Sequence, residues 1–358
     1  MDPLGTERGR PGASSPARPG APGHAAGPVS KLWTALRRCW QAASLAHGTD
    51  TSAGTGASLG LAALAAVLLA VGVIRAHTGP TPAPDKPIAR FAVVSFYNPR
   101  LMYLKYQPLI DYLTQHTPWR FELALSTSYR ETVSRLCRGD VELAYLGPYT
   151  YLRAREQCGA KAILRLNTGG REHYYSYVMV REDSSVRRIE DLRGRAFGFG
   201  AILSTSSHLM PRAMLLNAGL RPGLDVACRY YEHHERAARG VLMGEVQACG
   251  IRDLVGEQFK GRGLRILARS EPMLNFPLSV HPQAPPALVA ALTEALVALP
   301  RRDPAAAKVI QGWDAELSGG FAPVRPDRYA AIVGLAKFVF GPAAMSLSPD
   351  QLACEPGR

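Results

Sequence analysis

The sequence lacks the short motifs that identify most nucleotide-binding, metal-binding and ester-cleaving proteins. Gly198 and Gly200 match the first two glycines of a dinucleotide fingerprint, but Leu203 stands where the third is required. No GK[ST] follows, which excludes a Walker loop, and no GxSxG surrounds the nearby serines, which argues against a hydrolase nucleophile. We therefore expect no nucleotide cofactor and no enzymatic activity.

Cysteine is scarce and badly spaced for metal binding. The six cysteines form no CxxC pair, and none has a histidine at zinc-ligand spacing, so we expect no metal site. If the main domain lies outside the cytoplasm, Cys137 and Cys158 could bridge two neighbouring helices; small buried thiols are the equally open alternative.

The chain also lacks a concentrated basic block. The 358 residues carry a formal net charge of +13, but beyond the N-terminal region the positive charge is scattered among acidic residues. No nucleic-acid-binding motif accompanies it, so we expect no nucleic-acid partner and only a general preference for anions.

One long stretch is free of charge. Residues 57–74 read "ASLGLAALAAVLLAVGVI", near the shortest length that spans a bilayer, and most nearby basic residues precede it. We expect residues 1–56 to be a disordered basic cytoplasmic tail, 57–75 a transmembrane signal anchor, and 76–87 a Pro-rich spacer. The main domain would then lie outside the cytoplasm on a single-pass protein. Cleavage of the helix and a start nearer Val29 stay open.

After the spacer, short apolar runs alternate with longer amphipathic segments, which is typical of βα units and a mainly parallel sheet. The order of elements repeats in outline, which predicts two α/β lobes within residues 88–345. Lobe 1 would comprise about 88–175 and 270–345 and lobe 2 about 176–269, followed by a tail at 346–358. Ligands of such folds bind beyond the carboxyl ends of strands, between the lobes.

A dense run of hydroxyl groups follows one predicted strand. Ser204, Thr205, Ser206, Ser207 and His208 lie between the run "FGFG" and a helix whose first turn should contain Pro211. Helix N-termini attract anions, and hydroxyl donors can surround an oxyanion without a full positive charge. We expect this loop to face the cleft, although a solvated turn or an ordinary helix cap would also use such residues.

Aromatic and imidazole side chains gather at other strand ends. Tyr97, Tyr106, Tyr145, Tyr149 and Tyr177 lie at or near strand ends or crossovers, where a phenol can donate to a ligand; each alone is equally compatible with packing. A His-His-Glu sequence begins another predicted helix, and neutral imidazole also donates to anions.

Five segments together resemble the phosphate, phosphite and phosphonate-binding proteins of ABC transporters, the PhnD-like members of the type 2 periplasmic-binding fold. They are "YLKYQPLIDYL", "GDVELAYLGPYTYLRA", "YYSYVMVREDSSVRRIEDLRGRAFGFG", "STSSHLMPRAMLLNAG" and "HHERAARGVLMGEVQACG". The resemblance implies that residues 88–345 are a solute-binding domain of two Rossmann-like lobes that close over a phosphorus oxyanion. It also implies a periplasmic domain anchored in the inner membrane, with ABC permease and ATPase subunits as partners. By motif, the implied ligand contacts are Tyr106, Tyr145, Tyr149, Ser204, Thr205, Ser206, His208 and His234.

Two features depart from the family pattern. Gln247 stands where many relatives have an acid, which argues against an aminoalkylphosphonate and for a simpler oxyanion, unless Gln247 is merely structural. The predicted anchor also differs from the usual released or lipid-bound form. It favours an alternative in which the clamp signals to a membrane histidine kinase; an enzyme on the same fold is a further alternative.

Overall fold

The computed structural model describes residues 85–299, 310 and 313–354, which belong to a compact unit that begins at Pro84. The predicted cytoplasmic tail, the membrane anchor and residues 76–84 of the spacer lie outside the described residues. Among the described residues, no helix combines the length and the apolar character that a bilayer span requires.

Six strands form the first sheet, in the order β13-β4-β12-β3-β1-β2. Their bounds are β1 Ile88–Val93, β2 Arg120–Leu125, β3 Leu143–Tyr145, β4 Lys161–Leu166, β12 Pro277–Val280 and β13 Phe321–Pro323. The helices between or after these strands are α3 Pro99–His116, α4 Tyr129–Arg138, α5 Pro148–Cys158 and α9 Pro286–Ala298.

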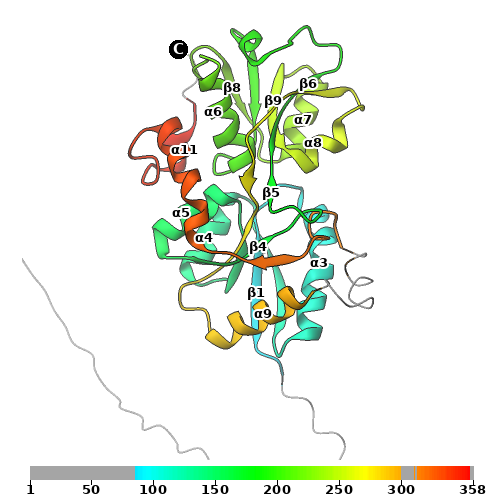
Figure 1. Ribbon diagram of the computed structural model, residues 1–358, viewed down its shortest axis with the longest axis vertical. Coiled ribbons are helices and arrows are strands. Elements are labelled where there is room, and N and C mark those ends of the chain that lie inside the picture. The colour runs from blue at the N-terminus through cyan, green and yellow to red at the C-terminus, as the bar shows by residue number, and fades with distance from the viewer. Residues whose placement is uncertain (1–84, 300–309, 311–312, 355–358) are drawn as a thin grey trace, which may run out of the picture. The chain divides into compact units, whose positions relative to one another are not determined.

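Five strands form the second sheet, in the order β10-β6-β9-β7-β8. Their bounds are β6 Ser176–Arg181, β7 Ala196–Phe199, β8 Ala227–Tyr230, β9 Ala248–Arg252 and β10 Leu264–Arg269. The associated helical segments are η1 Ile189–Leu192, η2 Thr205–Leu209, α6 Met210–Asn217, α7 His234–Leu242 and α8 Asp253–Phe259. The two segments that connect the sheets contain β5 (His173–Tyr174) and β11 (Met273–Leu274), which pair as a two-stranded ribbon. Figure 1 shows β5 between the two sheets.

The expectation of mainly parallel sheets is wrong in part. In the first sheet only β1 pairs in parallel, with β2 and β3, whereas β12 and β13 run antiparallel to their neighbours. In the second sheet β7 pairs in parallel with β8 and β9, but β6 and β10 are antiparallel. Two of the antiparallel strands, β6 and β12, are those on which the chain enters one sheet from the other.

Helix ends follow the sequence signals closely. Ser128 caps α4 by accepting a hydrogen bond from the Glu131 amide, and Gly139 ends it with a φ of 74°. Helix α5 starts at Pro148 and ends before Gly159, which has a φ of 75°. These ends place the N-termini of α5 and η2 on facing sides of the junction between the sheets, where the two segments contact each other.

The C-terminal segment joins both lobes. Helix α11 (Ala330–Phe340), which follows the short η3 (Pro326–Tyr329), packs on α5 beside the first sheet and on α6 beside the second, and Figure 1 shows it along both. Residues 346–354, expected only as a tail, contain α12 (Pro349–Leu352), which a capping box of Ser348 and Gln351 stabilises.

Two disulfides complete the fold. Cys137 is bonded to Cys158, which joins the ends of α4 and α5. Cys228 on β8 is bonded to Cys354, which fastens the C-terminal segment to the edge of the second sheet, and Cys249 is a buried free thiol. Disulfides of this kind persist in oxidising compartments.

Candidate functional site

The serine-rich loop forms a helical turn, η2, that runs directly into α6. Ser204 is its N-cap and accepts a hydrogen bond from the Ser207 amide at 3.2 Å. Pro211 lies in the first turn of α6, as the sequence predicts, because its missing N–H costs nothing there. Gly200 approaches this turn so closely that a Cβ at that position would lie 2.0 Å from Ser207 Oγ.

The serine-rich loop does not face an open cleft, so the expectation that it would is wrong. Residues 204–208 are each at most 2% exposed. Hydrogen bonds cross the junction around them: the Tyr149 amide donates to Thr205 Oγ1 at 2.9 Å, and Thr150 Oγ1 donates to the Leu203 carbonyl at 2.9 Å. The two lobes are therefore closed against each other at this point.

Several buried hydroxyl groups at the junction find no hydrogen-bond partner among the described residues. Two of them, Ser206 Oγ and Tyr174 OH, lie on the side of the serine-rich loop. The hydroxyls of Thr205 and Ser206 lie close enough to influence the pKa of Tyr174, although burial raises it overall. Buried hydroxyls are usually satisfied, so orphaned ones at a lobe junction indicate a place for an external acceptor.

A second group of orphaned hydroxyls lies on the first-sheet side. Ser95, Tyr97 and Ser126 each have a buried hydroxyl without a partner, and all three line a cavity of about 150 Å³. His233 from the second lobe also lines this cavity, and its Nδ1 is 2.8 Å from the Ser95 carbonyl oxygen. Burial raises the pKa of Tyr97 strongly, with the nearby Glu316 as the next cause, so this phenol stays protonated and remains a donor.

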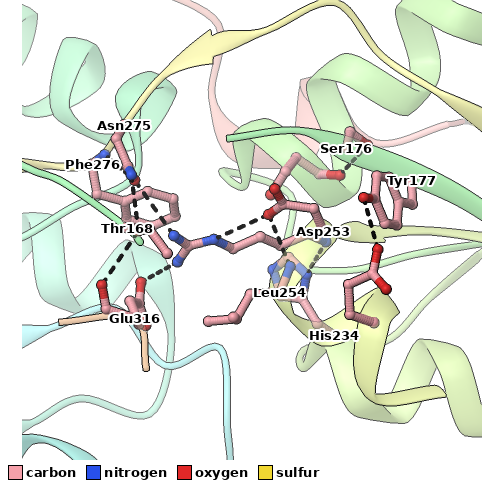
Figure 2. A network of polar contacts seen from close by, with 12 residues as sticks. Thr168, Ser176, Tyr177, His234, Asp253, Leu254, Asn275, Phe276 and Glu316 are labelled. Carbon is pink, nitrogen blue, oxygen red and sulfur yellow. Dashed lines mark hydrogen bonds and ion pairs between the residues drawn. The ribbon is translucent and has the colours of Figure 1, made fainter. Parts of the chain in front are cut away.

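A buried ion pair joins the two lobes between these groups. Arg252, the last residue of β9, pairs with Glu316 from the segment before β13, and both side chains are at most 2% exposed. Arg252 Nη2 also contacts Asn275 Oδ1 at 3.4 Å, while its Nε has no hydrogen-bond partner among the described residues. Figure 2 shows Asn275 and Glu316 on one side of this network and Asp253 and His234 on the other.

Aromatic rings hold the guanidinium of Arg252 in place. Its Cζ lies 4.4 Å from the ring centroid of Phe276 and 5.1 Å from that of Tyr174. The ring of Tyr174 therefore packs against Arg252 while its hydroxyl faces the serine-rich loop. Burial alone would lower the pKa of Arg252, but Glu316 and its other anionic neighbours reverse this, so the cation is retained.

The structure brings the predicted Tyr106 and Tyr145 together, but at a different acceptor from the one expected. Tyr145 OH donates to Glu316 Oε1 at 2.6 Å, and Tyr106 OH donates to Glu316 Oε2 at 3.1 Å. Their phenols thus bind a carboxylate of the protein itself. Tyr149 contributes its backbone amide to Thr205, and its own hydroxyl reaches the Ala344 carbonyl at 3.5 Å.

The two predicted histidines have different surroundings. His234 begins α7, and its Nδ1 accepts a hydrogen bond from the Arg252 amide at 3.0 Å, which leaves the proton on Nε2. His208 instead points into the second lobe, where Nδ1 meets the Ile202 carbonyl at 2.6 Å and Nε2 meets Tyr230 OH at 3.2 Å. Burial lowers the pKa of both histidines to about 3, so both are neutral near pH 7.

Gln247 has the structural role that the sequence left open as one of two interpretations. Its Oε1 accepts a hydrogen bond from the Ala196 amide at 3.0 Å, at the start of β7 and just before β9. The site residue on this strand is Arg252, at the opposite end of β9. Gln247 is therefore a structural residue, and it says nothing about the charge of a ligand.

Sequence reasoning missed Arg252, Glu316 and Tyr174. Arg252 follows an apolar strand at a strand-to-helix junction, which is a signal that could have been used. Glu316 gave no signal, because its role depends on a contact with a residue 64 positions away.

Comparison with known proteins agrees with this architecture. Residues 91–329 match the family model described as "ABC transporter, phosphonate, periplasmic substrate-binding protein". The phosphate-import protein PhnD of Mycolicibacterium smegmatis is 32% identical over 121 residues, which are 32% of this chain. That alignment spans 37% of the relative's length.

Solved structures show the same fold. A binding protein component of an ABC phosphonate transporter from Pseudomonas aeruginosa has a TM-score of 0.65 at 18% identity, covering 76% of this chain and 94% of its own. PhnD1 of Prochlorococcus marinus in complex with methylphosphonate has a TM-score of 0.64 at 15% identity, covering 72% and 100%. The chain belongs to the family of phosphonate-binding periplasmic proteins of ABC transporters, whose members bind substrates and are not enzymes.

Proposed function

We propose that this protein captures a phosphorus oxyanion (phosphate, phosphite or a small phosphonate) outside the cytoplasm and delivers it to the permease and ATPase subunits of an ABC transporter. Family membership supports the class of ligand and partner. The named relatives, one a phosphate importer and one solved with methylphosphonate, support this range of ligands. The two disulfides support an oxidising, extracytoplasmic compartment.

The observation that carries the proposal is the set of orphaned hydroxyls on both sides of the lobe junction: Ser95, Tyr97, Ser126, Tyr174 and Ser206. Each can donate one hydrogen bond, and all lack an acceptor among the described residues. A phosphorus oxyanion offers several acceptor oxygens in a small volume. It would satisfy donors from both lobes together and so stabilise their closure.

Ligand binding can be tested by titration calorimetry on the full-length protein with phosphate, phosphite and methylphosphonate. We expect at least one of them to bind with 1:1 stoichiometry, because closed donors without acceptors favour a compact oxyanion. Sulfate serves as the control for a tetrahedral anion without phosphorus. Absence of binding across the three phosphorus compounds would contradict the proposal.

Within the site, the hydroxyl of Ser206 is the donor whose removal is easiest to interpret. Replacing Ser206 with alanine should weaken binding by roughly 1–3 kcal/mol, about 5- to 150-fold, because the hydroxyl is buried and makes no other hydrogen bond as a donor. The matched control is Ser346→Ala, since Ser346 is exposed and donates only to the Ala343 carbonyl. Equal affinities for Ser206→Ala and the wild type would remove Ser206 from the site.

Attachment to the inner membrane through residues 57–75 belongs to the same proposal, supported by the uncharged run and the charge distribution around it. Fractionation of cells that express the full-length chain would test it. Recovery with the membranes, resistant to alkaline carbonate, is the expected result, whereas release with the soluble periplasmic fraction would contradict it.

A further inference from the structure

We propose that Arg252 makes this site reject phosphonates that carry a cationic substituent. Its guanidinium fills the place beside Glu316 that a ligand ammonium would otherwise take. The inference rests on the proposed function, since it concerns the ligand of the same site. Among phosphonates, the site would then favour those whose organic substituent is neutral.

Arg252 lies close to the serine-rich loop. One tyrosine, Tyr174, connects the two: its ring lies 5.1 Å from Arg252 Cζ, and its hydroxyl lies beside those of Thr205 and Ser206. In this proposal, a phosphonate whose oxygens bind the loop extends its substituent past Tyr174 to the guanidinium. Two cations brought together in a buried site repel each other strongly, because little water screens them.

Glu316 already has a cationic partner within the protein. Its carboxylate is buried and accepts hydrogen bonds from Tyr106, Tyr145 and Arg252. A carboxylate held by two neutral phenols is a strong partner for one cation, and in this chain the protein itself supplies that cation. Oε1 accepts from both Tyr145 and Arg252, and Oε2 accepts from Tyr106, so a ligand ammonium would have to compete with Arg252 for this carboxylate.

One other carboxylate lies close to the guanidinium. Asp253 Oδ1 is 3.9 Å from Arg252 Nε, too far for a hydrogen bond, and it accepts the Leu254 amide at 2.8 Å. Burial, as the largest cause, raises the pKa of Asp253. His234 on the same side is neutral. Asp253 is thus a weaker and more distant anion than Glu316, and the experiment must separate the two.

The test compares ethylphosphonate with aminoethylphosphonate, which differ by one ammonium group, in calorimetric titrations of the full-length protein. The wild type should favour ethylphosphonate on the order of 100-fold, as expected for a buried like-charge contact. Arg252→Ala frees Glu316 and opens space, so its preference should reverse toward aminoethylphosphonate. Arg252→Lys keeps a cation and should keep the preference of the wild type.

The double variant Arg252→Ala with Glu316→Gln identifies the carboxylate and guards against misfolding, because it removes both buried charges together. It should lose the reversed preference. If it still favours aminoethylphosphonate, Asp253 and not Glu316 attracts the ammonium, and the role given to Glu316 is overturned.

Failure of the inference is distinct from failure of the proposed function. A wild type that binds both phosphonates equally well would leave the function standing and overturn the selection by Arg252. A wild type and variants that bind neither phosphonate, nor phosphate or phosphite, would overturn both.

Discussion

Replacing Glu316 with alanine should lower the free energy of unfolding by about 3–5 kcal/mol, the largest effect we expect from any single charged residue. The change leaves the guanidinium of Arg252 buried without its counter-ion and leaves the phenols of Tyr106 and Tyr145 without acceptors. Each of these groups is buried, so water cannot replace the lost partner and the cost of desolvation remains. Urea unfolding followed by circular dichroism measures the difference.

The matched control for this variant is Asp350→Ala. Asp350 pairs with Arg130 at 2.9 Å, but both side chains are largely exposed, so water and salt replace the interaction. Its removal should change the free energy of unfolding by less than about 1 kcal/mol. Similar losses in the two variants would contradict the view that burial gives the Arg252–Glu316 pair its weight.

Removal of the Cys228–Cys354 disulfide, with both residues replaced by serine, should lower the free energy of unfolding by about 3–5 kcal/mol. The bond closes a loop of 126 residues, so it strongly restricts the unfolded chain. It also holds the C-terminal segment at β8, where the Cys354 amide donates to Tyr230 OH at 2.9 Å. Replacing both cysteines avoids mispairing with the buried thiol of Cys249.

The Cys137–Cys158 bridge provides the comparison, because it closes only 21 residues. The chain-entropy model gives the longer bridge an advantage of about 1.6 kcal/mol from the ratio of the two loop lengths. Both double variants should be unfolded in urea without reductant, alongside the wild type. A larger loss from removing the shorter bridge would show that native-state packing, and not loop length, sets the contribution of each disulfide.

Local signals in the sequence predicted much of the fold. The apolar runs at β1, β4 and β9 and the glycine stops at Gly139 and Gly159 depend on neighbours within a few residues, so they can be read along the chain. The direction of β6 and β12 could not be predicted in this way. It depends on how the chain passes between the two sheets, which is a property of the whole topology.

The candidate site was predictable to a smaller extent. The serine-rich loop and His234 were found because helix N-termini with donor side chains have a local pattern. Tyr106 and Tyr145 were found, but their acceptor, Glu316, lies 210 and 171 residues further along the chain. A pairing at that distance leaves no periodicity or motif in the sequence. Arg252 differs, because it stands at a strand-to-helix junction, but its partner Glu316 is just as distant in the chain.

The bond between Cys228 and Cys354 also imposes an order on maturation. The shorter bridge can form as soon as residue 158 has reached the oxidising side of the membrane, while most of the domain is still to follow. The longer one must wait until residue 354 has been exported, so the edge of the second lobe is sealed last. An export intermediate that stalls before that residue would carry one cross-link and an unfastened second lobe, and proteases should recognise it as immature.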